Sequence, residues 1–85
     1  MAINKEEVKY SIKAIFSLWL DKEKIEDGDK LSVVAIDGEK NVVSRFETTP
    51  DDDYTEKVYD MFYLDGVKGI ELWHNDNVLG VVDVN

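Results

Sequence analysis

The stretch LSVVAIDGEKNVVSRFE, residues 31–47, decides the fold of this 85-residue chain. Two runs rich in β-branched residues flank DGEK, residues 37–40, which is the strongest turn signal in the sequence. The pattern predicts a β-hairpin with a four-residue loop, in which Ile36 pairs with Asn41. Alternation along the strands then places Leu31, Val33, Ala35, Val42 and Phe46 on one face, and Val34, Ile36, Val43 and Arg45 on the other.

A second hairpin is predicted from GIELWHNDNVLGVVDV, residues 69–84. Its turn falls near Asn75 and Asp76, because Asn and Asp tolerate the positive φ that tight turns require. The HNDN segment, residues 74–77, lacks the spacing of a calcium loop and is interpreted as the hairpin tip. Alternation predicts Ile70, Leu72, Leu79 and Val81 on one face, and Trp73, Val78, Val82 and Val84 on the other.

The first helix is predicted over about residues 5 to 24. Asn4 and Glu7 fit a capping box, and Ile3 with Val8 occupies the two positions of a hydrophobic staple. Apolar residues recur at helical spacing along this segment, which predicts a buried stripe. The stripe consists of Val8, Ile12, Ile15, Phe16 and Trp19.

The second helix is predicted to begin within TTPDDDYTEK, residues 48–57. Thr49 suits the N-cap and Pro50 the first helical position, and Asp51 and Asp52 would lie where free N–H groups favour a carboxylate. Gly66 offers a left-handed residue to close the helix. Its buried stripe would be Tyr54, Val58, Met61 and Phe62.

These elements follow one another in the order αββαββ. We therefore expect one small α+β domain over residues 1–85, with a four-stranded, mainly antiparallel sheet. Two helices on one face of the sheet are the simplest arrangement. The alternative is one helix on each face, because the second face of the sheet would otherwise be strongly apolar.

Composition limits the classes of function that fit. The chain has no cysteine, which excludes disulfides, thiolate nucleophiles and cysteine-ligated metals. Its net charge of −9 argues against direct binding to nucleic acid or to anionic membranes. The charged N-terminus and the lack of a long apolar run predict a cytoplasmic protein. No catalytic, cofactor-binding or metal-binding motif occurs, so we expect neither an enzyme nor a cofactor.

The predicted second helix carries one candidate binding surface. Asp52, Glu56 and Asp60 recur at a spacing of four residues, where like charges are unfavourable for an isolated helix. Tyr59 and Tyr63 flank this row, and tyrosine is enriched at protein interfaces. The five residues predict an acidic strip that binds a partner, with Glu47 and Asp65 as further contributors. A solvated helix face is the alternative interpretation.

The outer face of the sheet is the second candidate. If both helices cover the opposite face, an apolar surface centred on Trp73 is left without a covering element. Trp73 is therefore also predicted to bind a partner, and to be partly exposed in an isolated monomer. The other predicted members of this surface are Val34, Ile36, Val43, Val78, Val82 and Val84.

In size, acidity and absence of cysteine the chain resembles, as a type of protein, the small inhibitors encoded by bacteriophages. These include uracil-DNA glycosylase inhibitors and anti-CRISPR proteins, which bind nucleic-acid enzymes stoichiometrically. The resemblance implies a non-catalytic module whose acidic surface engages a basic protein partner, by occupying a nucleic-acid site. The alternative is a small homodimeric structural or regulatory protein that associates through its sheet.

Overall fold

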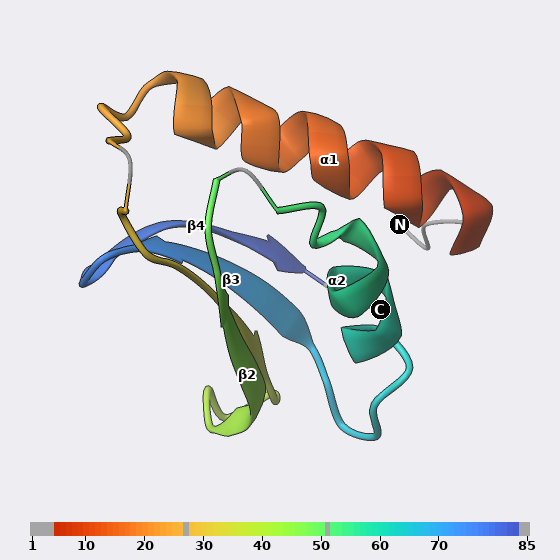
Figure 1. Ribbon diagram of the computed structural model, residues 1–85. Coiled ribbons are helices and arrows are strands. Elements are labelled where there is room, and N and C mark those ends of the chain that lie inside the picture. The colour runs from red at the N-terminus through yellow and green to blue at the C-terminus, as the bar shows by residue number, and fades with distance from the viewer. Residues whose placement is uncertain (1–4, 27, 51, 84–85) are drawn as a thin grey trace.

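The predicted αββαββ order is confirmed in the computed structural model, which describes residues 5–26, 28–50 and 52–83 (Figure 1). The elements are α1 (Lys5–Asp21), β1 (Leu31–Ile36), β2 (Val42–Thr48), α2 (Thr55–Met61), β3 (Gly69–His74) and β4 (Asn77–Asp83). The strands form a single antiparallel sheet in the order β2-β1-β3-β4. The α+β class is therefore confirmed.

The two hairpins meet at the centre of the sheet, where β1 pairs with β3. Their register aligns Leu31 with His74 and Ile36 with Gly69. Backbone bonds continue the pairing beyond both ends, from Lys68 N to Ile36 O at 2.8 Å and from Asn75 N to Lys30 O at 2.9 Å. The edge strands β2 and β4 each have only one neighbour within the sheet.

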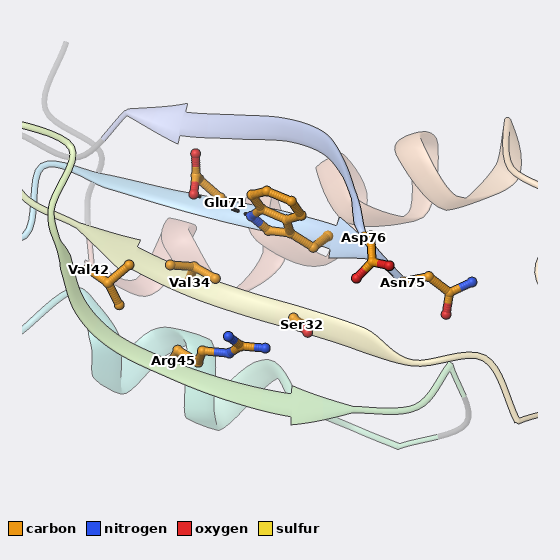
Figure 2. Close-up of a pocket in the computed structure, with 8 residues that line it drawn as sticks. Ser32, Val34, Val42, Arg45, Glu71, Asn75 and Asp76 are labelled. Carbon is orange, nitrogen blue, oxygen red and sulfur yellow. Dashed lines mark hydrogen bonds between the residues drawn. The ribbon is translucent and has the colours of Figure 1, made fainter.

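Both helices cover the same face of the sheet, as predicted, and the alternative of one helix on each face is wrong. The core contains Phe16 of α1 and Val58 of α2, packed with Val33 and Leu72 of the central strands. Neither of the described helices lies over the opposite face, and Figure 2 shows the helices behind the sheet when this face is viewed. The buried core residues are Ile12, Phe16, Leu31, Val33, Ala35, Val58, Met61, Val67, Ile70, Leu72 and Val82.

α1 presents four residues of the expected apolar stripe to this core, and the side chain of the fifth, Val8, lies outside the part that the structure describes. Ile12 and Phe16 are buried, and Ile15 and Trp19 pack against them at the edge of the core. The helix ends at Asp21, three residues before the predicted end. Its last turn closes with hydrogen bonds between residues three apart, such as that from Lys22 N to Trp19 O. The predicted cap Asn4, and Ile3 of the predicted staple, lie outside the described residues.

The predicted start of α2 is wrong. The helix begins at Thr55, and before it Asp52 N donates a hydrogen bond to Thr49 O at 3.2 Å. Asp51, which was predicted in the first turn, lies outside the described residues. Thr49 is therefore not the N-cap. Asp53 bonds the helix start instead, because its Oδ1 accepts a hydrogen bond from Thr55 N at 3.1 Å. β2 ends at Thr48, so the helix starts later along the chain than the sequence predicts.

The buried stripe predicted for α2 is confirmed. Val58 and Met61 are buried, and Tyr54 and Phe62 pack at the edge of the core. Gly66 has a φ of +84°, as expected for a left-handed residue, although it closes the turn after the helix rather than the helix itself.

Each hairpin contains a β-bulge, and each bulge changes the predicted faces. In the first hairpin Ile36 pairs with Val42, not with Asn41, because the register shifts between Ala35 and Ile36. Val42 therefore lies on the face away from the helices, which corrects its predicted place beside Leu31. Lys40, with a φ of 67°, supplies the left-handed residue that follows the turn.

In the second hairpin the register shifts between Leu72 and Trp73. Val82 pairs with Ile70 and is buried in the core, whereas Val81 pairs with Glu71 and is exposed on the opposite face. The predicted faces of Val81 and Val82 were therefore exchanged. The turn at residues 75–76 is confirmed, with Asn75 at a φ of 54°, whereas Val84 lies outside the described residues.

Gly80 is required by the packing of α1 on the edge of the sheet. A Cβ atom at this position would lie 2.6 Å from Cζ2 of Trp19, so no other residue fits without displacing the indole ring. We expect Gly80→Ala to lower the free energy of unfolding by about 1 to 3 kcal/mol through overpacking. Urea denaturation measures the change. Gly38→Ala is the matched control, because its nearest new contact is 3.8 Å away, and equal losses in the two variants would contradict the assigned packing.

A second prediction concerns the start of α2. Asp53→Ala removes the carboxylate that accepts the Thr55 N–H and should lower the urea midpoint. Thr49→Ala removes a side chain that precedes the helix by several residues and should leave the midpoint unchanged. A loss of stability in Thr49→Ala without one in Asp53→Ala would restore the cap predicted from the sequence.

Candidate protein-binding surface

The face of the sheet away from the helices is the most distinctive surface of the molecule. We call it the open face. Its residues on β1 are Ser32, Val34 and Ile36, which alternate with the core residues of the same strand. Although no helix covers them, these three side chains are only 6%, 7% and 9% exposed. They are buried by longer side chains from the neighbouring strands, so the open face has a packed floor.

A hollow of about 220 Å³ lies in the open face, over the middle of β1 (Figure 2). β1 supplies its floor, β2 supplies one side, and β3 with the following turn supplies the other. The lining residues are Ser32, Val34, Val42, Arg45, Glu71, Trp73, Asn75 and Asp76.

Trp73 forms one wall of this hollow. It stands opposite Ser32 of β1 and Val78 of β4 in the strand register. Its Nε1–H donates a hydrogen bond of 3.3 Å to Oε1 of Glu71, two residues earlier on the same face. Because Ser32 is small, space remains beside the ring. The prediction that Trp73 lies away from the helices and is partly exposed is confirmed.

Exposed valines extend the apolar surface on both sides of Trp73, with Val42 in the lining of the hollow and Val78 and Val81 on the edge strand β4. Val42 is 63% exposed, Val78 49% and Val81 45%. Val81 reaches toward the centre of the sheet, because Gly69 lies between it and Ile36. A Cβ atom at Gly69 would be 3.2 Å from Ile36 and 3.4 Å from Val81. The absence of a side chain at Gly69 thus lets both neighbours approach each other over β3, which extends the apolar surface.

The charges on and beside the open face are of both signs. Nη2 of Arg45 lies 3.4 Å from Oε1 of Glu47, and Nζ of Lys30 lies 3.8 Å from Oε2 of the same carboxylate. These groups are exposed and contribute little to stability. Glu71 and Asp76, on the other side of the hollow, form no salt bridge with a described residue. The hollow therefore has one cation, paired with Glu47, on the β2 side and two carboxylates on the β3 side.

The acidic strip does not exist as the single helical row that was predicted. Asp52 precedes α2, and its Oδ2 accepts a hydrogen bond of 3.4 Å from Thr48 Oγ1. Only Glu56 and Asp60 stand one turn apart on the helix, both exposed. The spacing argument therefore applies to one like-charge pair and not to two.

Tyr59 and Tyr63 form a contact pair on the exposed side of the helix layer. Their rings meet edge to face with centroids 5.2 Å apart, and Tyr63 Oη donates to Tyr59 Oη at 2.6 Å. Tyr59 also packs against the core, so part of its role is structural. The six predicted site residues thus divide between two opposite layers, with Trp73 alone on the open face.

Sequence reasoning missed several residues of the open face. Val42 and Val81 were assigned to the core because the bulges were not recognised. Ser32, Glu71 and Asp76 were not selected because no local pattern distinguishes them. The signal that was present is Gly80, since an isolated glycine within a strand often marks a bulge or a close approach of two chain segments.

The chain matches no protein-family model, and no curated protein or solved structure is detectably similar to it. Within the part of the chain that the structure describes, no three His, Asp or Glu side chains gather as a metal site would require. None of the described helices is long and apolar enough to cross a membrane. Function must therefore be argued from the surfaces of this molecule.

His74, at the end of β3, fastens the segment before β1 to the second hairpin. Its Nε2 lies 2.8 Å from Oδ2 of Asp29, and Asn75 Oδ1 accepts a hydrogen bond from Lys30 N at 3.2 Å. The same Asp29 oxygen accepts the backbone N–H of Glu26 at 2.9 Å. These bonds hold the turn that supplies Asn75 and Asp76 to the hollow.

The pKa of Asp29 is lowered from its ordinary value of 3.8, first by the backbone N–H of Glu26 and then by His74. Ionised Asp29 therefore favours the folded state, fully above about pH 4, and this contribution disappears as the pH falls through the lowered pKa. We expect Asp29→Asn to reduce the urea midpoint at pH 7, with a difference from the wild type that shrinks below about pH 4.

Asp65→Asn is the matched control, because it removes one carboxylate from an exposed turn. It should change the midpoint less than Asp29→Asn at pH 7. A difference between the wild type and Asp29→Asn that stays constant down to pH 2.5 would show that Asp29 is not linked to folding in this way.

Proposed function

We propose that this chain is a non-catalytic protein-binding module that engages a basic partner through its open face. The observation that carries the proposal is the sheet face that neither described helix covers, with Trp73 in the wall of its hollow and exposed Val42, Val78 and Val81 on the same face. Tryptophan is one of the residues enriched among the hot spots of protein interfaces. A packed floor that needs no further folding also suits rigid docking.

The charge of the chain supports a basic protein over other partners. A net charge of −9 repels anionic surfaces and attracts basic ones, chiefly by accelerating association. It also opposes the pairing of two copies of the chain. Proteins that act on nucleic acids carry basic binding sites, and a module that occupies such a site is a stoichiometric inhibitor. This is the form of the function that we propose, within the reducing environment of the cytoplasm.

In this proposal the acidic residues near α2 have a secondary role. Asp52, Glu56 and Asp60 lie on the helix side of the molecule, as do Tyr59 and Tyr63, so they are not part of the docking face. Their charge contributes to long-range attraction. We therefore assign affinity to the open face and association rate to the acidic surface.

The proposal predicts that Trp73→Glu abolishes partner binding while leaving the fold intact. Proteins retained from the native cell by the immobilised chain would be identified by mass spectrometry, and the best basic candidate purified. Its dissociation constant should rise at least about 30-fold for Trp73→Glu, the effect of losing a hot-spot residue. The double variant Glu56→Lys with Asp60→Lys should mainly slow association at low salt.

Leu18→Glu is the matched control, because Leu18 is exposed on α1, in the helix layer, and the charge change is the same. It should bind normally. If Trp73→Glu unfolds the chain, Val78→Glu tests the same face at an exposed position. Normal partner affinity in folded variants at both positions would overturn the proposal. A stable dimer at low micromolar concentration, dissolved by Trp73→Glu, would show instead that the open face binds a second copy.

A further inference from the structure

The hollow beside Trp73 has the size of a side-chain pocket. Its volume of about 220 Å³ is below the roughly 300 to 1,000 Å³ of pockets that hold drug-sized ligands. It opens on the face that we assign to partner binding, and its floor of Ser32 and Val34 is already buried. The hollow therefore has the right size to bind a single side chain of a partner, which we call the guest side chain.

The wall formed by β3 selects the charge of that guest. Glu71 uses Oε1 to accept the Trp73 indole N–H, and a carboxylate has further acceptor positions on both oxygens. Asp76 is exposed at the rim of the same hollow. No described cation pairs with either carboxylate. The aromatic ring and the two carboxylates thus offer an unoccupied site for a cation on one side of the hollow.

The single cation that lines the hollow does not reverse this preference. Arg45 is paired with Glu47, and this carboxylate lies between the Arg45 charge and the nearby Lys30 on the β2 side, away from Glu71 and Asp76 on the β3 side. An anionic guest would meet two carboxylates in the hollow and a net charge of −9 in the whole chain. Among cationic side chains, the planar guanidinium of arginine both stacks on an aromatic ring and donates to several carboxylate oxygens.

We propose that the hollow receives an arginine side chain of the protein partner, with the guanidinium stacked on Trp73 and hydrogen-bonded to Glu71 and Asp76. This inference rests on the proposed function and specifies the chemistry of its partner. The valines around the hollow contact the apolar part of the partner's surface, while the arginine determines where the partner docks. Val42 closes the opposite side of the hollow, against the aliphatic stem of the guest.

N-acetyl-arginine amide is a probe that needs no knowledge of the partner. Titrated into ¹⁵N-labelled chain, it should shift the Trp73 indole N–H and the amides of Ser32 and Glu71 with one saturable curve. The uncharged isostere N-acetyl-citrulline amide should bind at least about threefold more weakly, because it lacks the charge that the carboxylates and the ring recognise. The two indole resonances are assigned with Trp19→Phe.

Two matched substitutions locate the effect. Glu71→Gln should weaken arginine binding by about threefold to tenfold, the loss of one charge-assisted interaction. Glu23→Gln removes the same charge from an exposed position just after α1, which has no role in the proposed binding, and should leave binding unchanged. Equal binding of citrulline, equal effects of the two substitutions, or arginine shifts spread over the acidic surface without the Trp73 indole would each overturn the inference.

The outcome is separable from that of the proposed function. Saturable arginine binding at Trp73, in a chain whose protein partners are all insensitive to Trp73→Glu, would refute the proposed function alone. A partner that depends on Trp73, together with no arginine response in the hollow, would refute only the arginine assignment. A partner whose docking survives replacement of each of its surface arginines would do the same.

Discussion

The antiparallel pairing of β1 with β3 is the interaction on which the rest of the structure depends. It joins residues 31–36 to residues 69–74, and so connects two hairpins that are far apart in the sequence. Its register places Leu72 beside Val33 in the core and Trp73 beside Ser32 on the open face. Because side chains alternate along a strand, a slip of one residue would exchange the two faces of β3. The core and the hollow are therefore consequences of one alignment.

The edges of the sheet adapt to this centre through irregular pairing. Each hairpin has one more residue on its outer strand than a regular ladder needs, and the extra residue forms a bulge. The bulge in β4 turns Val82 into the core, and the bulge in β2 turns Val42 outward. Gly80 lies where α1 crosses the edge, and its hydrogen leaves room for the Trp19 ring. The helix layer, the sheet edge and the open face are thus adjusted together.

This arrangement places the exposed apolar residues and the acidic residues of α2 on opposite sides of the molecule. Apolar anchoring groups lie on the open face, around Trp73, whereas Glu56, Asp60 and Tyr63 lie with the helices on the other side. A partner of ordinary size cannot contact both layers through one flat interface. In the function that we propose, the open face supplies the short-range contacts with the partner and the carboxylates of the helix layer supply a long-range field. The hydrogen bond between Asp29 and His74 keeps the turn that borders the hollow in place.

The sequence by itself determined the order of the elements, the α+β class, both hairpin turns and the buried stripes of the helices. These features depend on local periodicity and turn chemistry, which are set by residues close together in the sequence. The position of Trp73 followed from the same alternation.

Only the tertiary structure decided the faces of Val42, Val81 and Val82, the start of α2 and the shape of the hollow. Bulges arise where two strands must match each other in twist and length, so a single strand does not reveal them. Thr49 is a residue type that suits an N-cap. However, β2 ends at Thr48 at the edge of the sheet, and α2 begins in the helix layer only at Thr55. The hollow combines Ser32, Glu71, Trp73 and Asp76, which only strand register and the second turn bring together. Such long-range geometry is a property of packing, and no window of sequence contains it.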